Sequence, residues 1–307
     1  KPSLANLSLI KEKIKETDIV FIQGPAMASF LGIYYGHKYH KPTLLYTHTI
    51  IWELFEKFAP KIIRRLFFRI LKWGSIQIYN RCTEILVPYH ELKSQLEREG
   101  ITAPISVARL GVDIDQFSPT KDKTLAKTKL GISPESFVIG YVGRVSKEKN
   151  MYTLREAFRK LRHKKRVFLL IVGDGPEKEV QPFKELRNCQ VTGFVNNVED
   201  YLKAMDLFIM PSLTETTSLA TLEAMSTGLP VIATKVGFIK QYLVKGHNGL
   251  FFPRNSSTLL AIKIDQLMRN RELREKLAQN ARKTVTYSFS WDRSMNKIKR
   301  LLGKHYE

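Results

Sequence analysis

Cysteine and long apolar runs are both scarce in this sequence. Two cysteines, Cys82 and Cys189, occur among 307 residues, too few for a disulfide framework or a cysteine-rich metal site. This scarcity favours a reducing compartment such as the cytoplasm. No apolar run reaches the roughly 20 residues that a membrane-spanning helix needs, so the sequence argues against a transmembrane protein.

Acidic residues are also few relative to basic ones. Lys and Arg total 50 against 29 Asp and Glu, which gives a net charge of +21. Such an excess predicts an anionic partner: nucleic acid, an anionic membrane surface or a phosphorylated substrate. Because no recognised nucleic-acid motif is present, we expect no nucleic-acid partner. The hydrophobic content of 43% is ordinary for a globular protein.

Short apolar strands alternate with helical stretches along the whole chain. The expected strands are 17–23, 42–47, 84–88, 105–108, 137–143, 167–173, 190–192, 207–210 and 230–234. This rhythm predicts an α/β fold with two doubly wound parallel sheets. A Gly/Asp/Pro-rich linker near 109–119 divides the chain into domains 1–115 and 116–289. The final helix, 290–307, is a candidate to pack back on the first domain.

The segment 211–234, PSLTETTSLATLEAMSTGLPVIAT, carries the clearest chemical pattern. Glu215 and Glu223 are expected before a helix and about two turns into it. A helix N-terminus binds anions through its unpaired N–H groups and its positive dipole end. Carboxylates beside such a site are best suited to accept hydrogen bonds from hydroxyl groups. An anion flanked by polyols describes a nucleotide sugar.

Other residues at strand ends could complete this site. Arg144 and Lys149 follow one strand at a spacing suited to clamping a diphosphate. His48 ends a strand of the first domain, where it could donate a hydrogen bond or move a proton at a cleft between domains. Plainer interpretations stay open: a capped helix with solvated glutamates, a solvated basic loop and a hydrogen-bonded polar histidine.

These motifs carry a resemblance to a known family. GRVSKEKN, VGDGPE, VTGFV and the 211–234 segment, in this order, resemble the retaining glycosyltransferases of family 4, which have the GT-B fold of two Rossmann-like domains. In the first half, YTHTIIWELFEKFAP, YNRCTEILVPYHELKSQL and ISVARLGVDIDQFSP are similar to the diacylglycerol glycosyltransferases of that family.

The resemblance implies a retaining transfer of a hexose from a UDP- or GDP-sugar, with no metal or cofactor required. It implies His48 and Glu215 as catalytic residues at the transferring sugar. The implied donor-binding residues are Gly143, Arg144 and Lys149 at the diphosphate, Phe194 and Val195 at the base, Thr216, Thr217, Ser218 and Leu219 at sugar and phosphate, and Glu223 at the ribose. In this family the leaving phosphate is described as helping to deprotonate the acceptor.

The sequence departs from the family pattern in three places. Ser218 stands where the family usually has glycine, and Gln23 stands where a histidine is frequent, so Gln23 receives no role. Nothing before Asp18 resembles the strand and Gly-rich loop with which the family begins. We therefore expect that part of the first domain to be absent from this sequence.

A basic and aromatic stretch suggests a membrane surface as partner. Residues 57–83 contain seven Lys and Arg and no acid, and on a helix they would suit anionic lipid headgroups. The candidate membrane contacts are Lys61, Arg64, Arg65, Phe68, Arg69, Lys72 and Trp73. An amphipathic helix with a solvated basic side is the alternative, and the basic run 159–166 is expected to be solvated.

Together these features predict a monomeric or weakly dimeric enzyme, peripheral on the cytoplasmic face of a membrane, with a diacylglycerol-type lipid acceptor. Two rivals stay open. One is transfer to a soluble or polyprenol-linked saccharide, and the other is nucleotide-sugar binding without turnover.

Overall fold

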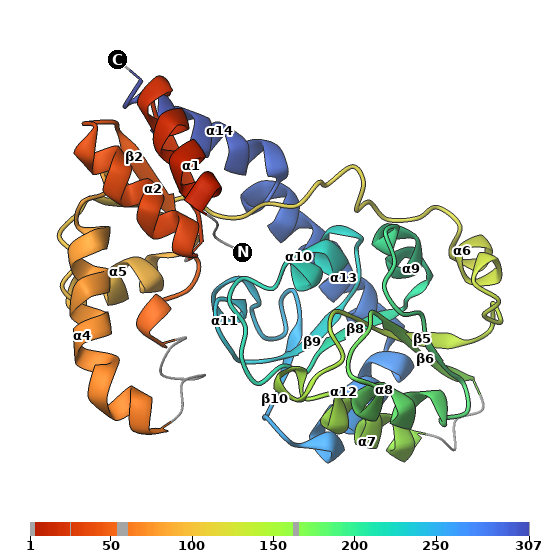
Figure 1. The fold of residues 1–307 in the computed structure, drawn as a ribbon. Helices are drawn as coiled ribbons and strands as arrows, with labels where there is room; N and C mark the ends of the chain where they lie inside the picture. Colours follow the sequence, from red (N-terminus) through yellow and green to blue (C-terminus); the bar gives the residue numbers. More distant parts are fainter. Residues whose placement is uncertain (1–3, 25, 54–60, 162–165, 307) are drawn as a thin grey trace. The chain divides into compact units, whose positions relative to one another are not determined.

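The structure is a computed structural model that describes residues 4–24, 26–53, 61–161 and 166–306. The chain divides into two compact units (Figure 1). The first comprises residues 1–110 and 294–307, and the second comprises residues 111–293. Each contains one parallel sheet covered by helices, which confirms the predicted α/β class.

The first unit is built on four parallel strands in the order β1-β2-β3-β4. The strands are β1 (Val20–Gln23), β2 (Thr43–Tyr46), β3 (Glu84–Val87) and β4 (Ile105–Val107). Its helices are α1 (Leu4–Glu16), α2 (Met27–Lys38), α4 (Lys61–Tyr79), α5 (His90–Arg98) and α14 (Trp291–Gly303). Helices on both sides of the sheet explain why its central strands, β2 and β3, are buried at every position.

Alternate residues of β2 face two different cores, because successive strand side chains point to opposite faces. Leu45 joins the core that also contains residues of α2, α4 and α5. Leu44 and Tyr46 pack instead with Leu301 of α14. The last helix therefore closes the second face of the first sheet. Just beyond this helix, His305 Nε2 lies 2.9 Å from Glu84 Oε2.

The second unit has six parallel strands in the order β10-β9-β8-β5-β6-β7. The strands are β5 (Phe137–Val142), β6 (Val167–Val172), β7 (Cys189–Val191), β8 (Leu207–Met210), β9 (Val231–Thr234) and β10 (Leu250–Phe252). Chain order reverses between β5 and β8. In open parallel sheets, ligands bind outside the carboxyl ends of the strands at such a reversal.

Helices cover both faces of this six-stranded sheet. One face carries α7 (Met151–Leu161), α8 (Glu177–Lys184) and α12 (Ser257–Arg269), and the other carries α9 (Val198–Ala204), α10 (Leu219–Ser226) and α13 (Arg271–Ser288) (Figure 1). The shorter elements α6 (Lys123–Lys129), η1 (Lys147–Lys149) and α11 (Ile239–Tyr242) complete the unit. Two helical layers on one sheet bury the central strands completely, as Ile139, Phe208 and Ile232 show.

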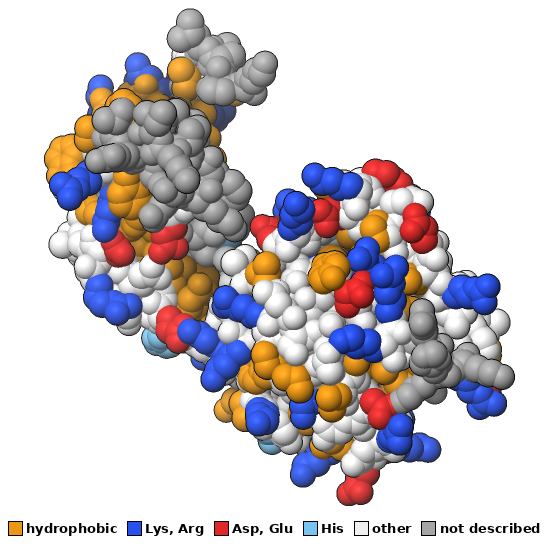
Figure 2. All heavy atoms as spheres, turned by 90° about the horizontal axis from the view of Figure 1, so that it is seen from below, with side chains coloured by type: hydrophobic (Ala, Val, Ile, Leu, Met, Phe, Trp, Pro, Cys, Tyr) orange, Lys and Arg blue, Asp and Glu red, His pale blue; other side chains and the backbone are white. Residues whose placement is uncertain are grey.

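One face of the molecule carries its positive charge in a dispersed form. On the face seen in Figure 2, Lys and Arg side chains are scattered among fewer acidic ones instead of forming one continuous patch. Among the helices that the structure describes, none is long and apolar enough to cross a membrane. Both cysteines are free thiols, and burial raises the pKa of each to about 12.

Candidate functional site

Two loops meet at the reversal point of the six-stranded sheet. Residues 143–150 follow β5 and residues 211–218 follow β8, and these two strands are neighbours. The amide of Leu213 donates to the carbonyl of Glu148 at 2.9 Å. The side chain of Asn150, which has a left-handed φ of 53°, donates to the carbonyl of Pro211 at 3.1 Å. The loops therefore form one hydrogen-bonded surface.

An ion pair connects the same two loops. Lys149 Nζ lies 2.6 Å from Glu215 Oε1, and the hydroxyl of Ser212 donates to the same oxygen at 2.6 Å. The side chains of Lys149 and Glu215 are 20% and 7% exposed. A carboxylate this buried needs a partner, because an unpaired buried charge is costly. Lys149 supplies that partner.

The start of α10 presents backbone donors. The carbonyls of the two preceding residues are used within the unit. The carbonyl of Thr216 accepts from the amide of Phe238 at 2.9 Å, and that of Thr217 accepts from the hydroxyl of Tyr242 at 3.0 Å. Within the described part of the chain, the amide N–H groups of Thr217, Ser218 and Leu219 donate no hydrogen bond. Unpaired N–H groups at a helix start form an anion-binding site.

Ser218 holds an unusual backbone conformation at this helix start. Its φ of 59° is left-handed, a region that favours glycine. Its hydroxyl forms a 2.8 Å hydrogen bond with that of Thr221, which supports the turn. A glycine at this position would adopt the same conformation without strain.

Two glycines keep the loops in close contact. A Cβ on Gly237 would lie 1.9 Å from the carbonyl oxygen of Glu215, and one on Gly173 would lie 2.1 Å from that of Gly143. Both glycines also have positive φ. Any larger residue would push apart the backbone segments that position Glu215 and the loop after β5.

Glu223 is a largely buried carboxyl group on α10. The helix begins at Leu219, so Glu223 lies one turn into it, and the sequence-based expectation of two turns is wrong. Burial, with a smaller contribution from the negative charge of Glu199, raises the pKa of Glu223 to about 7. The carboxyl therefore changes its protonation state near neutral pH.

The other predicted donor residues lie on loops of the same unit. Arg144 is exposed, and its carbonyl accepts from the hydroxyl of Tyr141 at 2.8 Å. A backbone bridge between Gly173 and Gly193 joins the loop after β6 to the one that carries Phe194. Phe194 is 83% exposed and Val195 is half-buried. An exposed aromatic ring on a rigid loop can stack on a planar base.

His48 belongs to the first unit and lies two residues beyond the end of β2, not at its last position. Its side chain is exposed. Two hydrogen bonds hold the neighbouring Thr47 in place. Its amide donates to the carbonyl of Leu86 at 2.9 Å, and its hydroxyl donates to the backbone carbonyl of Thr49 at 2.7 Å. His48 is thus presented to solvent by an ordered turn.

The candidate membrane contacts on α4 differ in exposure and in the contacts that they make. Arg69 and Trp73 are exposed, Trp73 by 65%. Lys72 forms an ion pair with Glu99. Phe68 is half-buried and packs partly against the core of the first unit, so it exposes less of its side chain than Trp73 does. The side chains of Lys61, Arg64 and Arg65 lie outside the described residues, as do residues 162–165 of the second basic run.

Sequence reasoning missed two exposed apolar residues on the same helix. Phe67 and Ile70 are 52% and 65% exposed. With Trp73 they form a stripe spaced by three residues, and such positions share one helix face. The three-residue spacing can be read from the sequence, but the sequence does not show which side of the helix faces the core.

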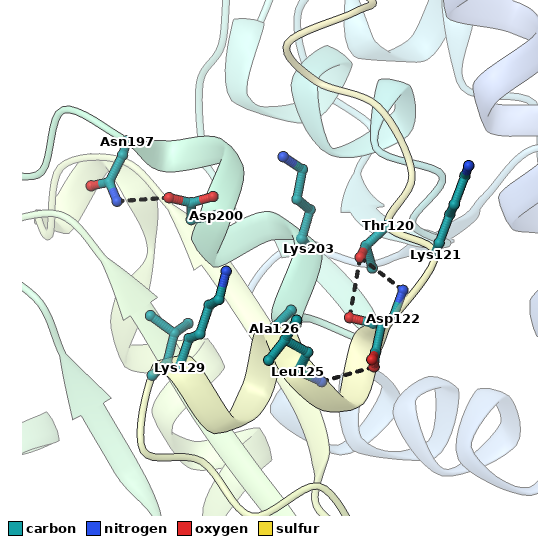
Figure 3. Close-up of a pocket in the computed structure, with 10 residues that line it drawn as sticks. Thr120, Lys121, Asp122, Leu125, Ala126, Lys129, Asn197, Asp200 and Lys203 are labelled. Carbon is teal, nitrogen blue, oxygen red and sulfur yellow. Dashed lines mark hydrogen bonds between the residues drawn. The ribbon is translucent and has the colours of Figure 1, made fainter.

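A pocket elsewhere in the second unit does not involve the predicted residues. It has a volume of about 510 Å³ and lies between α6 and α9 (Figure 3). Its lining includes Lys121, Asp122, Lys129, Asp200 and Lys203. None of the residues predicted to bind a donor lines it.

The sequence matches two family models. Residues 122–284 match the model described as glycosyl transferases group 1, and residues 1–116 match glycosyltransferase family 4. The chain belongs to the group 1 glycosyltransferases. The two matches together cover most of both structural units.

Curated relatives of this glycosyltransferase include enzymes named for lipid-linked acceptors. The chain is 28% identical over 283 residues to an alpha-monoglucosyldiacylglycerol synthase of Acholeplasma laidlawii, covering 86% of this chain and 70% of that protein. It is also 28% identical over 271 residues to a UDP-Gal:alpha-D-GlcNAc-diphosphoundecaprenol alpha-1,3-galactosyltransferase of Escherichia coli, covering 83% and 67%.

The fold of this glycosyltransferase matches solved structures. The structure of HepE from Anabaena in complex with UDP superposes with a TM-score of 0.83 at 20% sequence identity, covering 99% of this chain and 84% of that one. Together with the two parallel sheets, this likeness shows the predicted GT-B fold.

Proposed function

We propose that this protein is a retaining glycosyltransferase that moves a hexose from a UDP- or GDP-sugar to a membrane lipid of the diacylglycerol type. The observation that carries the donor half of this proposal is the joined pair of loops at the β5–β8 reversal point. They bring together a helix N-terminus, the Lys149–Glu215 ion pair and Glu223.

The ion pair suggests how the site receives a donor. Lys149 balances the charge of Glu215 before binding, and an arriving diphosphate offers Lys149 a stronger anionic partner. Glu215 can then accept a hydrogen bond from a sugar hydroxyl while Ser212 holds its carboxylate in place. Lys149, Arg144 and the amides at the start of α10 stabilise the negative charge that develops on the departing diphosphate.

The remaining roles in this proposal are those that the family resemblance implies. Phe194 and Val195 flank the base, and Glu223 accepts hydrogen bonds from the ribose hydroxyls. His48, exposed after β2 in the first unit, acts at the transferring sugar. The reaction in this proposal requires no metal ion or cofactor.

A lipid acceptor accords with the surface of α4. Phe67, Ile70 and Trp73 expose apolar area on one helix face, and Arg69 adds positive charge. Such a surface favours binding to anionic membranes. The Acholeplasma relative, named for a diacylglycerol glycolipid, supports the same acceptor class. We place the enzyme on the cytoplasmic face of a membrane.

A transfer assay tests this proposal directly. The protein would be incubated with radiolabelled UDP-glucose, UDP-galactose or GDP-mannose and with vesicles containing either diacylglycerol or an undecaprenol-linked saccharide, and lipids would be extracted. We expect label in the lipid phase with one donor, and its loss when Arg144 is replaced by alanine. Label in undecaprenol-linked sugars but not in diacylglycerol would favour the polyprenol acceptor, which the Escherichia coli relative suggests. Donor binding with no transfer would indicate a non-catalytic binder.

Vesicle co-sedimentation tests the membrane surface. A Phe67→Ser, Ile70→Ser, Trp73→Ser variant should bind vesicles with anionic lipid less than the natural protein. Ile262→Ser, which removes a side chain 54% exposed on α12, is the matched control and should bind normally. Equal binding by all three proteins would contradict the role of this stripe.

A further inference from the structure

A second pocket of the second unit has no role in the site described above. It has a volume of about 750 Å³, which is within the range of roughly 300–1,000 Å³ that is usual for small-molecule sites. None of the residues predicted to bind a donor lines it, and its lining belongs entirely to the second unit. We call it the α13 pocket, and its lining includes His247, Asn280, Lys283, Tyr287, Ser288 and Arg293.

Two asparagines fix the turn that carries His247 against α13. Asn280 Nδ2 donates to the carbonyl of His247 at 2.9 Å. Asn248 is 1% exposed, and its Nδ2 lies 3.0 Å from the hydroxyl of Thr284 and 2.8 Å from the carbonyl of Tyr242. These hydrogen bonds hold two walls of the α13 pocket together, and such preorganisation lowers the cost of binding.

The ionisable groups of the α13 pocket are all basic. His247, Lys283 and Arg293 line it, and no acid is among the described residues that do so. In the described part of the chain, no ion pair joins these three side chains to a carboxylate. By contrast, Arg271 at the other end of α13 pairs with Glu275 at 2.6 Å. The cations of the pocket are therefore available to an anion.

An exposed aromatic ring lies beside these cations. Tyr287 is 73% exposed, and Arg293 Cζ lies 5.1 Å from the centre of its ring. This cation–π contact holds the guanidinium next to the ring. Ser288 adds a hydroxyl to the lining, which can both donate and accept. An aromatic ring can pack on the apolar face of a sugar ring while cations and hydroxyls bind its polar groups.

We propose that the α13 pocket binds an acidic saccharide whose negative charge comes from carboxylate, sulfate or phosphate groups. An inorganic anion would use the cations but not the exposed ring. A neutral saccharide would use the ring but leave the cations without a partner. Saccharides are also the compounds on which glycosyl transferases act. This inference goes beyond the proposed function and depends on neither its donor nor its acceptor.

The test is calorimetric titration of trisaccharides into the full chain. Trigalacturonate, sulfated maltotriose and phosphorylated maltotriose carry the three kinds of negative group, and maltotriose is the neutral counterpart. Inorganic phosphate and a thymidine trinucleotide complete the set. We expect at least one acidic trisaccharide to bind more tightly than all three of these comparison ligands. Binding by none of the acidic trisaccharides, or equal or tighter binding of the trinucleotide, would overturn the inference.

A pair of double variants tests whether binding occurs in the α13 pocket. Lys283→Ala, Arg293→Ala should weaken binding of the acidic trisaccharide about tenfold or more, because charge-assisted hydrogen bonds are lost. Lys276→Ala, Lys299→Ala removes the same charge from exposed positions of α13 and α14 outside the pocket and should bind like the natural protein. Equal weakening in both variants would indicate attraction by net charge alone and would overturn the inference.

Two further variants separate the ring from the charges and the α13 pocket from the donor loops. Tyr287→Ala should weaken binding of the acidic trisaccharide, whereas Tyr287→Phe, which keeps the ring, should not. Arg144→Ala should leave this binding unchanged, and its loss there would place the saccharide at the donor loops and overturn the inference. Absence of nucleotide-sugar binding by the natural protein would contradict the proposed function and leave this inference intact.

Discussion

Glu223 is a carboxyl group in surroundings that favour its neutral form. Its pKa in the folded chain, about 7, exceeds the ordinary value of 4.5, so the folded state binds a proton more tightly than the unfolded state. Its contribution to stability is full below pH 4.5 and is lost as the pH rises through 7.

Replacing Glu223 by glutamine should therefore stabilise the ligand-free protein at high pH. We expect Glu223→Gln to raise the free energy of unfolding by up to about 3 kcal/mol at pH 8, with little difference at pH 4.5. Urea unfolding at both pH values measures this. An equal effect at the two pH values would contradict the assigned pKa.

The Lys149–Glu215 pair makes a second prediction at this scale. Lys149→Met leaves Glu215, 7% exposed, without its cation and should destabilise the protein by about 3–5 kcal/mol. Adding Glu215→Gln should recover most of this loss in urea unfolding but should not restore nucleotide-sugar binding. Recovery of binding in the double variant would show that Lys149 has no role at the diphosphate.

Residue roles were only partly visible in the sequence. The eight-residue spacing of Glu215 and Glu223 could be recognised, because both lie in one short segment. The partner of Glu215 could not, since Lys149 lies 66 positions away. Phe68 was chosen over Phe67 because composition shows that a helix is amphipathic but does not fix which neighbouring aromatic residue faces the core.

At the scale of elements, the start of α10 combines strain with hydrogen bonding. Ser218 has a left-handed φ and a hydrogen bond to Thr221. Ser218→Ala keeps the strain and loses the bond, whereas Ser218→Gly loses the bond but relieves the strain. We expect the glycine variant to be more stable than the alanine variant by about 1 kcal/mol. Urea unfolding of both variants checks this, and the reverse order would contradict the assigned strain.

Most elements were predictable because apolar strands alternate with helices and end at glycine or proline. The strand β10 was missed, since its three residues, LFF, are too short to show a period. The helices α1 and α11 were also missed. The first turn of α10 was placed too early because Ser218, a left-handed residue, marks the true start and its φ is not written in the sequence.

At the scale of the whole molecule, the C-terminal residues 294–307 belong to the first unit, although residues 111–293 form the second. Leu301 of α14 is 1% exposed and packs with Leu44 and Leu86. Leu301→Ala should destabilise the first unit by about 2–5 kcal/mol. Hydrogen exchange should then quicken in β2 and β3 and stay unchanged in β5 and β8. Equal acceleration in both sheets would contradict independent units.

The parallel sheets and the reversal of strand order followed from sequence rhythm and family resemblance together. Which face of the first sheet α14 covers could not be predicted from the sequence. The helix is distant along the chain, and the sequence of the strands that it contacts contains no pattern that identifies it. The dispersed positive charge in Figure 2 likewise could not be placed on a surface from composition alone.

The central claim is that the loops after β5 and β8 bind a nucleotide sugar. The most direct measurement is calorimetric titration of UDP-glucose and GDP-mannose into the natural protein and into an Arg144→Ala, Lys149→Ala variant at pH 8, with Lys129→Ala as a control outside these loops. We predict binding of at least one nucleotide sugar, unchanged in the control and weakened at least a hundredfold in the double variant. Equal affinity in all three proteins would contradict the claim.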